Sequence, residues 1–199
     1  MWQDIIGTFS NNIYFIFISY LLLGGGLKYI DDAFDETTFS KRKGMILAPL
    51  LGLLWAFTMV GNPISATILL AIVLGVLSKG KIDNPAHIFG FIVILLAFIL
   101  MKIEILLLPF VFLSAAAIVD EAGNDVTGYD AVFKRSKRFK HQFFVYFFGR
   151  RYMLKLAVLY LVLIGLFPMY SLIAIILFDE AYLTVEIYSC SLRNIKWAK

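Results

Sequence analysis

Four carboxylates stand directly after the first long apolar run of the sequence, at Asp31, Asp32, Asp35 and Glu36. On a helix, Asp31 and Asp35 share one face and Asp32 and Glu36 share the next, because side chains four residues apart lie above one another. Like charges at this spacing repel and destabilise the helix. A divalent cation removes that repulsion, and Mg²⁺ prefers one or two carboxylates together with water and a substrate phosphate. The pattern therefore predicts either a magnesium site or a solvated acidic cap on a helix end.

A second polar group follows a later apolar run and comprises Asp120, Glu121, Asn124 and Asp125. Basic side chains that can neutralise a phosphate stand in the other polar stretches, at Lys41, Arg42, Lys79 and Lys81. Carboxylates that bridge a metal to a diphosphate, with cations that neutralise the leaving charge, make a site for transfer from a diphosphate. His87 either positions a phosphate, shuttles a proton or is an ordinary residue of a helix end.

The composition indicates an integral membrane protein with one helical domain over residues 1–199. The chain has 199 residues, of which 61% are hydrophobic and 16% charged, and its mean hydropathy is +0.85. A soluble domain does not have this balance. The one cysteine, Cys190, excludes an internal disulfide and a cysteine-based metal site. No basic residue precedes the first apolar run and no small-residue cleavage site follows it, so we expect that run to be a permanent span.

The elements that must position these residues are apolar runs near the roughly 20 residues that cross a bilayer. They lie at 13–30, 45–60, 64–77, 88–119 and 153–178. The fourth run is long enough for two spans that turn near residues 101–104. The fifth contains Pro168 and is either one kinked span or two, the second extending towards Cys190. We expect an all-α, polytopic transmembrane bundle of about seven spans, with six as the alternative.

Lysine and arginine gather in alternate loops, a distribution typical of the cytoplasmic side of a membrane protein. They stand at 41–43, at 79–81 and from 134 to 151, whereas the intervening loops hold one lysine between them. We therefore expect the N-terminus outside, and the acidic and basic loops in the cytoplasm, of a multi-pass protein of the cell membrane. Residues 120–152 are expected as a cytoplasmic basic and aromatic interfacial loop. Its segment from 134 to 151 is expected as an interfacial helix attracted to anionic lipid headgroups, with a role in binding substrate as the alternative and with no nucleic-acid partner.

Two acidic motifs on one side of a helical membrane bundle resemble the UbiA superfamily of intramembrane prenyltransferases. The layout is similar from residue 23 to 151, although the chain is shorter than those enzymes and has DDxxDE where they have an Asn-Asp pair. The resemblance implies a Mg²⁺-dependent transfer of a prenyl group from a prenyl diphosphate to a lipid or aromatic acceptor. It implies metal ligands at Asp31, Asp32, Asp35, Glu36, Asp120, Glu121 and Asp125. Among these, Asp31, Asp32, Asp35, Asp120 and Asp125 would be catalytic, and Lys41, Arg42, Lys79, Lys81, His87 and Asn124 would bind substrate.

Two other classes of function remain open from the sequence. A small cation or proton-coupled transporter would use acids within a late span, and Asp179, Glu180 and Glu186 stand there. A non-catalytic membrane subunit needs neither group of acids. The oligomeric state is not determined by these patterns.

Overall fold

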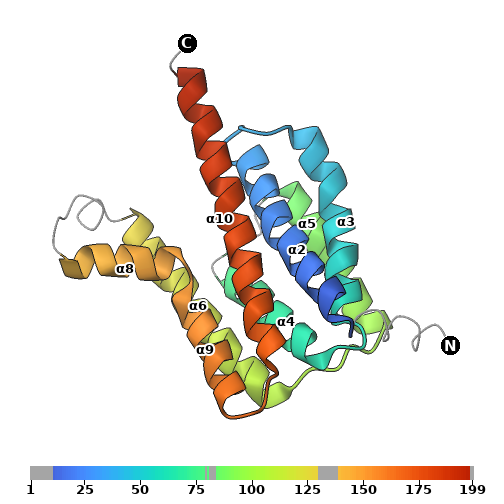
Figure 1. Ribbon diagram of the computed structural model, residues 1–199. Helices are drawn as coiled ribbons and strands as arrows, with labels where there is room; N and C mark the ends of the chain where they lie inside the picture. Colours follow the sequence, from blue (N-terminus) through green and yellow to red (C-terminus); the bar gives the residue numbers. More distant parts are fainter. Residues whose placement is uncertain (1–10, 79, 81–83, 130–138, 198–199) are drawn as a thin grey trace. The chain divides into compact units, whose positions relative to one another are not determined.

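The computed structural model describes residues 11–78, 80, 84–129 and 139–197, and this part of the chain contains eight α-helices and no strand. The all-helical expectation is confirmed for these residues. The helices are α2 (Ile13–Phe34), α3 (Lys41–Met59), α4 (Pro63–Ser78), α5 (Pro85–Leu100), α6 (Leu107–Tyr129), α8 (Phe139–Gly149), α9 (Tyr152–Leu163) and α10 (Met169–Trp197), as Figure 1 shows. Their contacts divide the chain into two compact units.

Asparagine side chains fix several helix starts. The Oδ1 atom of Asn12 accepts the Tyr14 N–H of α2 at 2.9 Å, and Asn84 accepts the His87 N–H of α5 at 2.9 Å. Asn62 does the same for Ser65 of α4 at 2.8 Å. Each bond satisfies a backbone donor that has no partner within its own helix, which is why asparagine is favoured before a first turn. The starts of these three helices lie within three residues of the apolar runs expected from residues 13, 64 and 88.

The first unit contains α2, α3, α5 and α10 from Ile173 onward, with α3 packed against both α2 and α5. A Cβ atom at Gly24 would overlap the backbone oxygen of Phe178, so α2 and α10 approach each other at backbone distance there. The Phe178 ring meets Tyr20 and Trp55 edge to face, at centroid separations of 6.4 and 6.3 Å. These buried rings form the centre of the core of this unit.

The second unit contains α6, α8, α9 and α4 from Thr67 onward, with α6 packed against α8 and α9. The Thr67 hydroxyl accepts the Leu106 N–H at 2.9 Å, which ties α4 to the start of α6. Between α9 and α10 the chain turns through Gly165, whose φ of 78° favours glycine, and Pro168 then precedes α10. The fifth apolar run therefore forms two helices and not one kinked helix.

Two helices of the described residues are long and apolar enough to cross a membrane: α2, and residues Leu107–Val126 of α6. The helices α4, α5 and α9 are apolar but shorter. Many large apolar side chains are exposed, among them Leu100, Leu107 and Leu108 by 76, 70 and 81%.

The polar stretch after Val119, expected as a loop whose basic and aromatic part is an interfacial helix, is mostly helical in its described part. Helix α6 continues to Tyr129, so the second acidic group lies on a helix, and α8 follows at Phe139–Gly149. Residues 120–129 include no proline to end the helix. The acids are therefore held on a regular surface, where residues 121 and 125 share a face.

Candidate functional site

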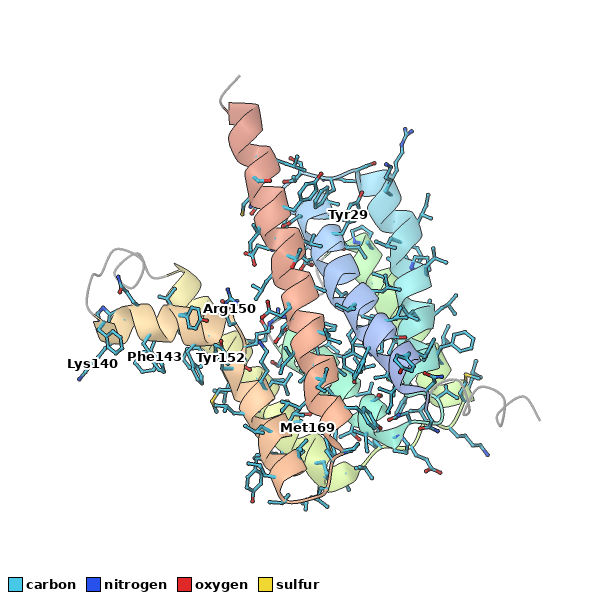
Figure 2. All side chains as sticks on the ribbon, in the orientation of Figure 1. Tyr29, Lys140, Phe143, Arg150, Tyr152 and Met169 are labelled. Atoms are coloured by element: carbon cyan, nitrogen blue, oxygen red, sulfur yellow. The ribbon has the colours of Figure 1, made fainter. Side chains whose placement is uncertain are left out.

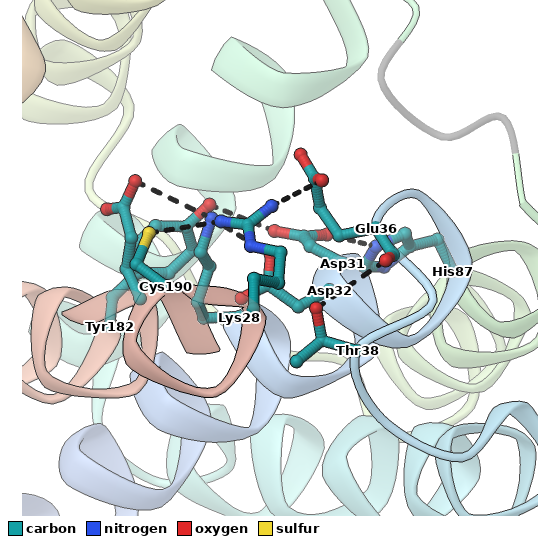
Figure 3. A network of polar contacts seen from close by, with 10 residues as sticks. Lys28, Asp31, Asp32, Glu36, Thr38, His87, Tyr182 and Cys190 are labelled. Atoms are coloured by element: carbon teal, nitrogen blue, oxygen red, sulfur yellow. Dashed lines mark hydrogen bonds and ion pairs between the residues drawn. The ribbon is translucent and has the colours of Figure 1, made fainter. Parts of the chain in front are cut away.

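A network of polar side chains lies at the C-terminal end of α2, where Figure 3 shows it. Its centre is Asp31, which accepts one hydrogen bond from His87 of α5 and one from Tyr182 of α10. The His87 Nε2 atom lies 2.6 Å from Asp31 Oδ1, and the Tyr182 hydroxyl lies 2.9 Å from Oδ2. Because an ionised carboxylate only accepts, the proton of this contact belongs to His87 Nε2. Three helices are thereby joined at one carboxylate.

The neighbouring Asp32 is only 1% exposed. Its Oδ1 atom lies 3.3 Å from the Lys28 ammonium, one helical turn earlier, whereas its Oδ2 atom is buried without a hydrogen-bond partner. Lys28 also lies 3.8 Å from Glu186 of α10 and 5.2 Å from the centre of the Tyr182 ring. A buried carboxylate oxygen without a partner carries a large desolvation penalty. Asp32 is therefore a buried carboxylate with only one of its two oxygens paired.

The outer edge of the network is a pair between Glu36 and Arg193 of α10. Arg193 also donates to the Cys190 sulfur at 3.0 Å, and hydrogen bonding to Glu36 and Cys190 raises the pKa of Arg193. Asp35 ends α2 and is exposed. Asp31 and Asp35 are thus not equivalent: one is bound between helices and the other stands at the helix end.

The network has more acidic than basic side chains. In its described contacts the carboxylates are Asp31, Asp32, Glu36 and Glu186, and the basic side chains are Lys28, His87 and Arg193. An excess of negative charge favours an added cation. Within the part of the chain that the structure describes, no three His, Cys, Asp or Glu side chains are placed to hold a metal ion together.

The second acidic group, in the other unit, makes structural contacts. Asp120 is 2% exposed and accepts two backbone N–H groups of α9, from Met153 at 3.0 Å and from Leu154 at 2.7 Å. The residue before α9, Arg151, has a φ of 49° and makes no side-chain cap. Asp120 of α6 therefore caps α9 from outside, and its negative charge also suits the positive end of that helix.

Glu121 strengthens the same junction. Its buried carboxylate lies 3.3 Å from Arg151, and Lys155 donates to the backbone oxygen of Arg150 at 2.9 Å. Asn124 and Asp125 lie further along α6 and are half-buried. The described contacts of this group thus connect α6 to the start of α9, and its role in binding a metal stays a prediction.

The other expected substrate-binding residues are placed as follows. Lys41 and Arg42 are exposed at the start of α3, and the Lys41 ammonium lies 5.7 Å from the centre of the Phe34 ring. Lys79 and Lys81 lie outside the described residues. In α10, Asp179 is buried and Glu180 is exposed.

The sequence interpretation did not single out Lys28 and Tyr182. Lys28 had a signal, since it is a charge inside an apolar run and stands four residues before Asp32. Tyr182 had a weaker one, since it stands four residues before Glu186 on the same helix. The chain matches no protein-family model, no curated protein and no solved structure.

Proposed function

We propose that this protein is a multi-pass membrane enzyme that binds Mg²⁺ at the C-terminal end of α2 and transfers a prenyl group from a prenyl diphosphate to a lipid or aromatic acceptor. The observation that carries the proposal is Asp32. Its buried Oδ2 atom has no hydrogen-bond partner, and it lies in a network rich in carboxylates at the end of a helix long enough to cross a membrane. A bound cation would supply the missing partner.

Mg²⁺ fits this donor set better than a metal that needs a closed protein cage. It is commonly held by one or two carboxylates, with waters and substrate phosphate oxygens completing an octahedron. Asp32 would supply one oxygen, and Asp35 or Glu36 at the end of α2 a second. The ion would neutralise charge that develops on the leaving diphosphate. Lys28 and Arg193, which already lie against carboxylates here, would contribute positive charge on the protein side.

The surroundings of the network support this substrate class. A prenyl diphosphate has a charged head and a long apolar tail, so its site needs charge beside an apolar phase. Residues Ile13–Phe34 supply both, because an apolar helix of 22 residues ends in the carboxylates. The exposed apolar side chains of α5 and α6 support placing this chain in a bilayer. The alternation of basic loops supports a cytoplasmic position for the network.

The test is turnover of a labelled allylic diphosphate by the purified protein, with Mg²⁺ and then with a chelator. Asp32→Asn keeps the shape of the side chain and should lower turnover by about a hundredfold or more, as loss of one charge-stabilising group does. Glu104→Gln is the matched control, because Glu104 is an exposed acid beyond the far end of α5. Turnover that survives both Asp32→Asn and the chelator would refute the proposal.

A further inference from the structure

Helix α8, Phe139–Gly149, presents a stripe of exposed aromatic side chains. None of its residues is buried, and Phe139, Phe143 and Tyr146 are exposed by 82, 49 and 54%. These three positions, with Arg150 just after the helix, follow the spacing of a single helical face. Figure 2 shows Lys140 and Phe143 projecting from α8. An aromatic face of this kind is costly to leave in water.

The other side of α8 is fixed to its own unit. A Cβ atom at Gly123 would overlap the ring of Phe148, so that ring packs directly on α6. The Phe147 ring lies 5.5 Å from the Tyr152 ring of α9 and 5.6 Å from the Phe143 ring. The exposed stripe is therefore held in place and is not a disordered set of side chains.

The length of α8 excludes a membrane crossing. At 1.5 Å per residue, its 11 residues extend about 16 Å, roughly half of a hydrocarbon core. The charges on α8 and next to it in the sequence have one sign, since there is no Asp or Glu from residue 131 to 178 while Lys140 and Arg150 flank the stripe. If two copies of this chain paired through the stripe, Lys140 and Arg150 of one copy would face the same cations of the other and repel them. An anionic lipid surface instead offers phosphates to the cations and acyl chains to the rings.

We propose that α8 lies along the surface of a bilayer leaflet that contains anionic lipid. Phe139, Phe143 and Tyr146 enter the boundary between headgroups and acyl chains, and Lys140 and Arg150 contact the phosphates. This inference rests on the membrane placement in the proposed function, but not on its metal or its prenyl diphosphate. It assigns a lipid class to a helix outside the polar network of α2.

The test measures the depth of a spin label in lipid nanodiscs. In the full chain with Cys190→Ser, single labels are placed by Gln142→Cys on α8, by Lys43→Cys and by Leu22→Cys. Gln142 lies beside the stripe, Lys43 is an exposed charge at the start of α3, and Leu22 is 54% exposed on α2. The accessibility of each spin label to oxygen, which enriches in the bilayer, and to a water-soluble nickel chelate is measured. The measurement is made in phosphatidylcholine alone and again with phosphatidylglycerol added.

We expect the oxygen-to-nickel ratio at residue 142 to rise when phosphatidylglycerol is added, and to fall again with Lys140→Gln and Arg150→Gln. The ratio at residue 43 should stay low. A label at residue 142 as exposed to nickel as that at residue 43 would overturn the inference. Protection of the label at residue 142 from nickel that does not depend on lipid charge, or that grows with protein concentration, would also overturn the inference and indicate a protein partner. A nickel-accessible label at residue 22 would instead overturn the membrane placement itself.

Discussion

At the scale of residues, the acidic group at the end of α2 and the acidic group on α6 make different kinds of contact in the described part of the chain. Asp31 and Asp32 lie where α2, α5 and α10 meet, and one oxygen of Asp32 has no partner. Asp120 uses both oxygens for backbone N–H groups of α9. A carboxylate already saturated by two short hydrogen bonds gains less from a metal than one with a buried free oxygen. The first group is therefore the better place to look for ligand binding.

The cap made by Asp120 gives a prediction about stability. Asp120→Ala leaves the N–H groups of Met153 and Leu154 without acceptors, which should lower the free energy of unfolding by about 1–3 kcal/mol. Asp125→Ala is the control, since Asp125 is half-buried on the same helix and outside this cap. Denaturant unfolding in detergent measures both variants. Unchanged stability with lost turnover would show that Asp120 acts on substrate and not on α9.

At the scale of elements, the glycines of α2 set how closely α10 can approach. Gly24 faces the backbone of Phe178, whereas a Cβ atom added at Gly25 would lie at ordinary contact distance, 3.5 Å from a side-chain atom of Val185. Small residues at such a crossing let two helix backbones come together. The close approach also supports the network, because Tyr182 of α10 lies one turn beyond Phe178.

Gly24→Ala should therefore destabilise the protein where Gly25→Ala does not. The new methyl group would push α10 away from α2, and overpacking of this kind costs about 1–3 kcal/mol. Thermal unfolding monitored by circular dichroism measures the difference between the two variants. Equal melting temperatures for both variants would contradict the described packing of α2 on α10.

At the scale of the whole molecule, the distribution of charge predicts a topology. The described helix α3, Lys41–Met59, separates a basic stretch from the turn at Gly61 and Asn62. If α3 crosses the membrane, the basic end lies in the cytoplasm and the turn lies outside. This orientation is what would place the network of Asp31 and Asp32 on the cytoplasmic side.

Topology reporters check this directly. A reporter fused after Lys43 or after Lys140 should give a cytoplasmic signal, and one inserted between Gly61 and Asn62 should give an external signal. An insertion after Glu104 serves as a second external position if α4 and α5 also cross. A cytoplasmic signal at Gly61 would contradict the expected orientation and remove the basis for placing the network in the cytoplasm.

The sequence by itself determined where the apolar helices lie. Apolar runs bounded by Asn12, Asn62 and Asn84 became α2, α4 and α5, because a side-chain cap and an apolar stretch are local features. The pairing of Lys28 with Asp32 was also local, since it lies within one helical turn. The continuation of α6 through Asp120 was not expected, since a polar stretch without proline does not have to leave the helix.

Only the tertiary structure decided which partner each acid received. Asp31 meets His87 and Tyr182, residues that lie on two other helices. Asp120 meets the start of α9. Spacing within one helix says nothing about such partners, because they depend on which helix faces pack together and how closely. The close packing of Gly24 on Phe178 is one example. It holds α10 against α2 and so brings Tyr182 within hydrogen-bond distance of Asp31.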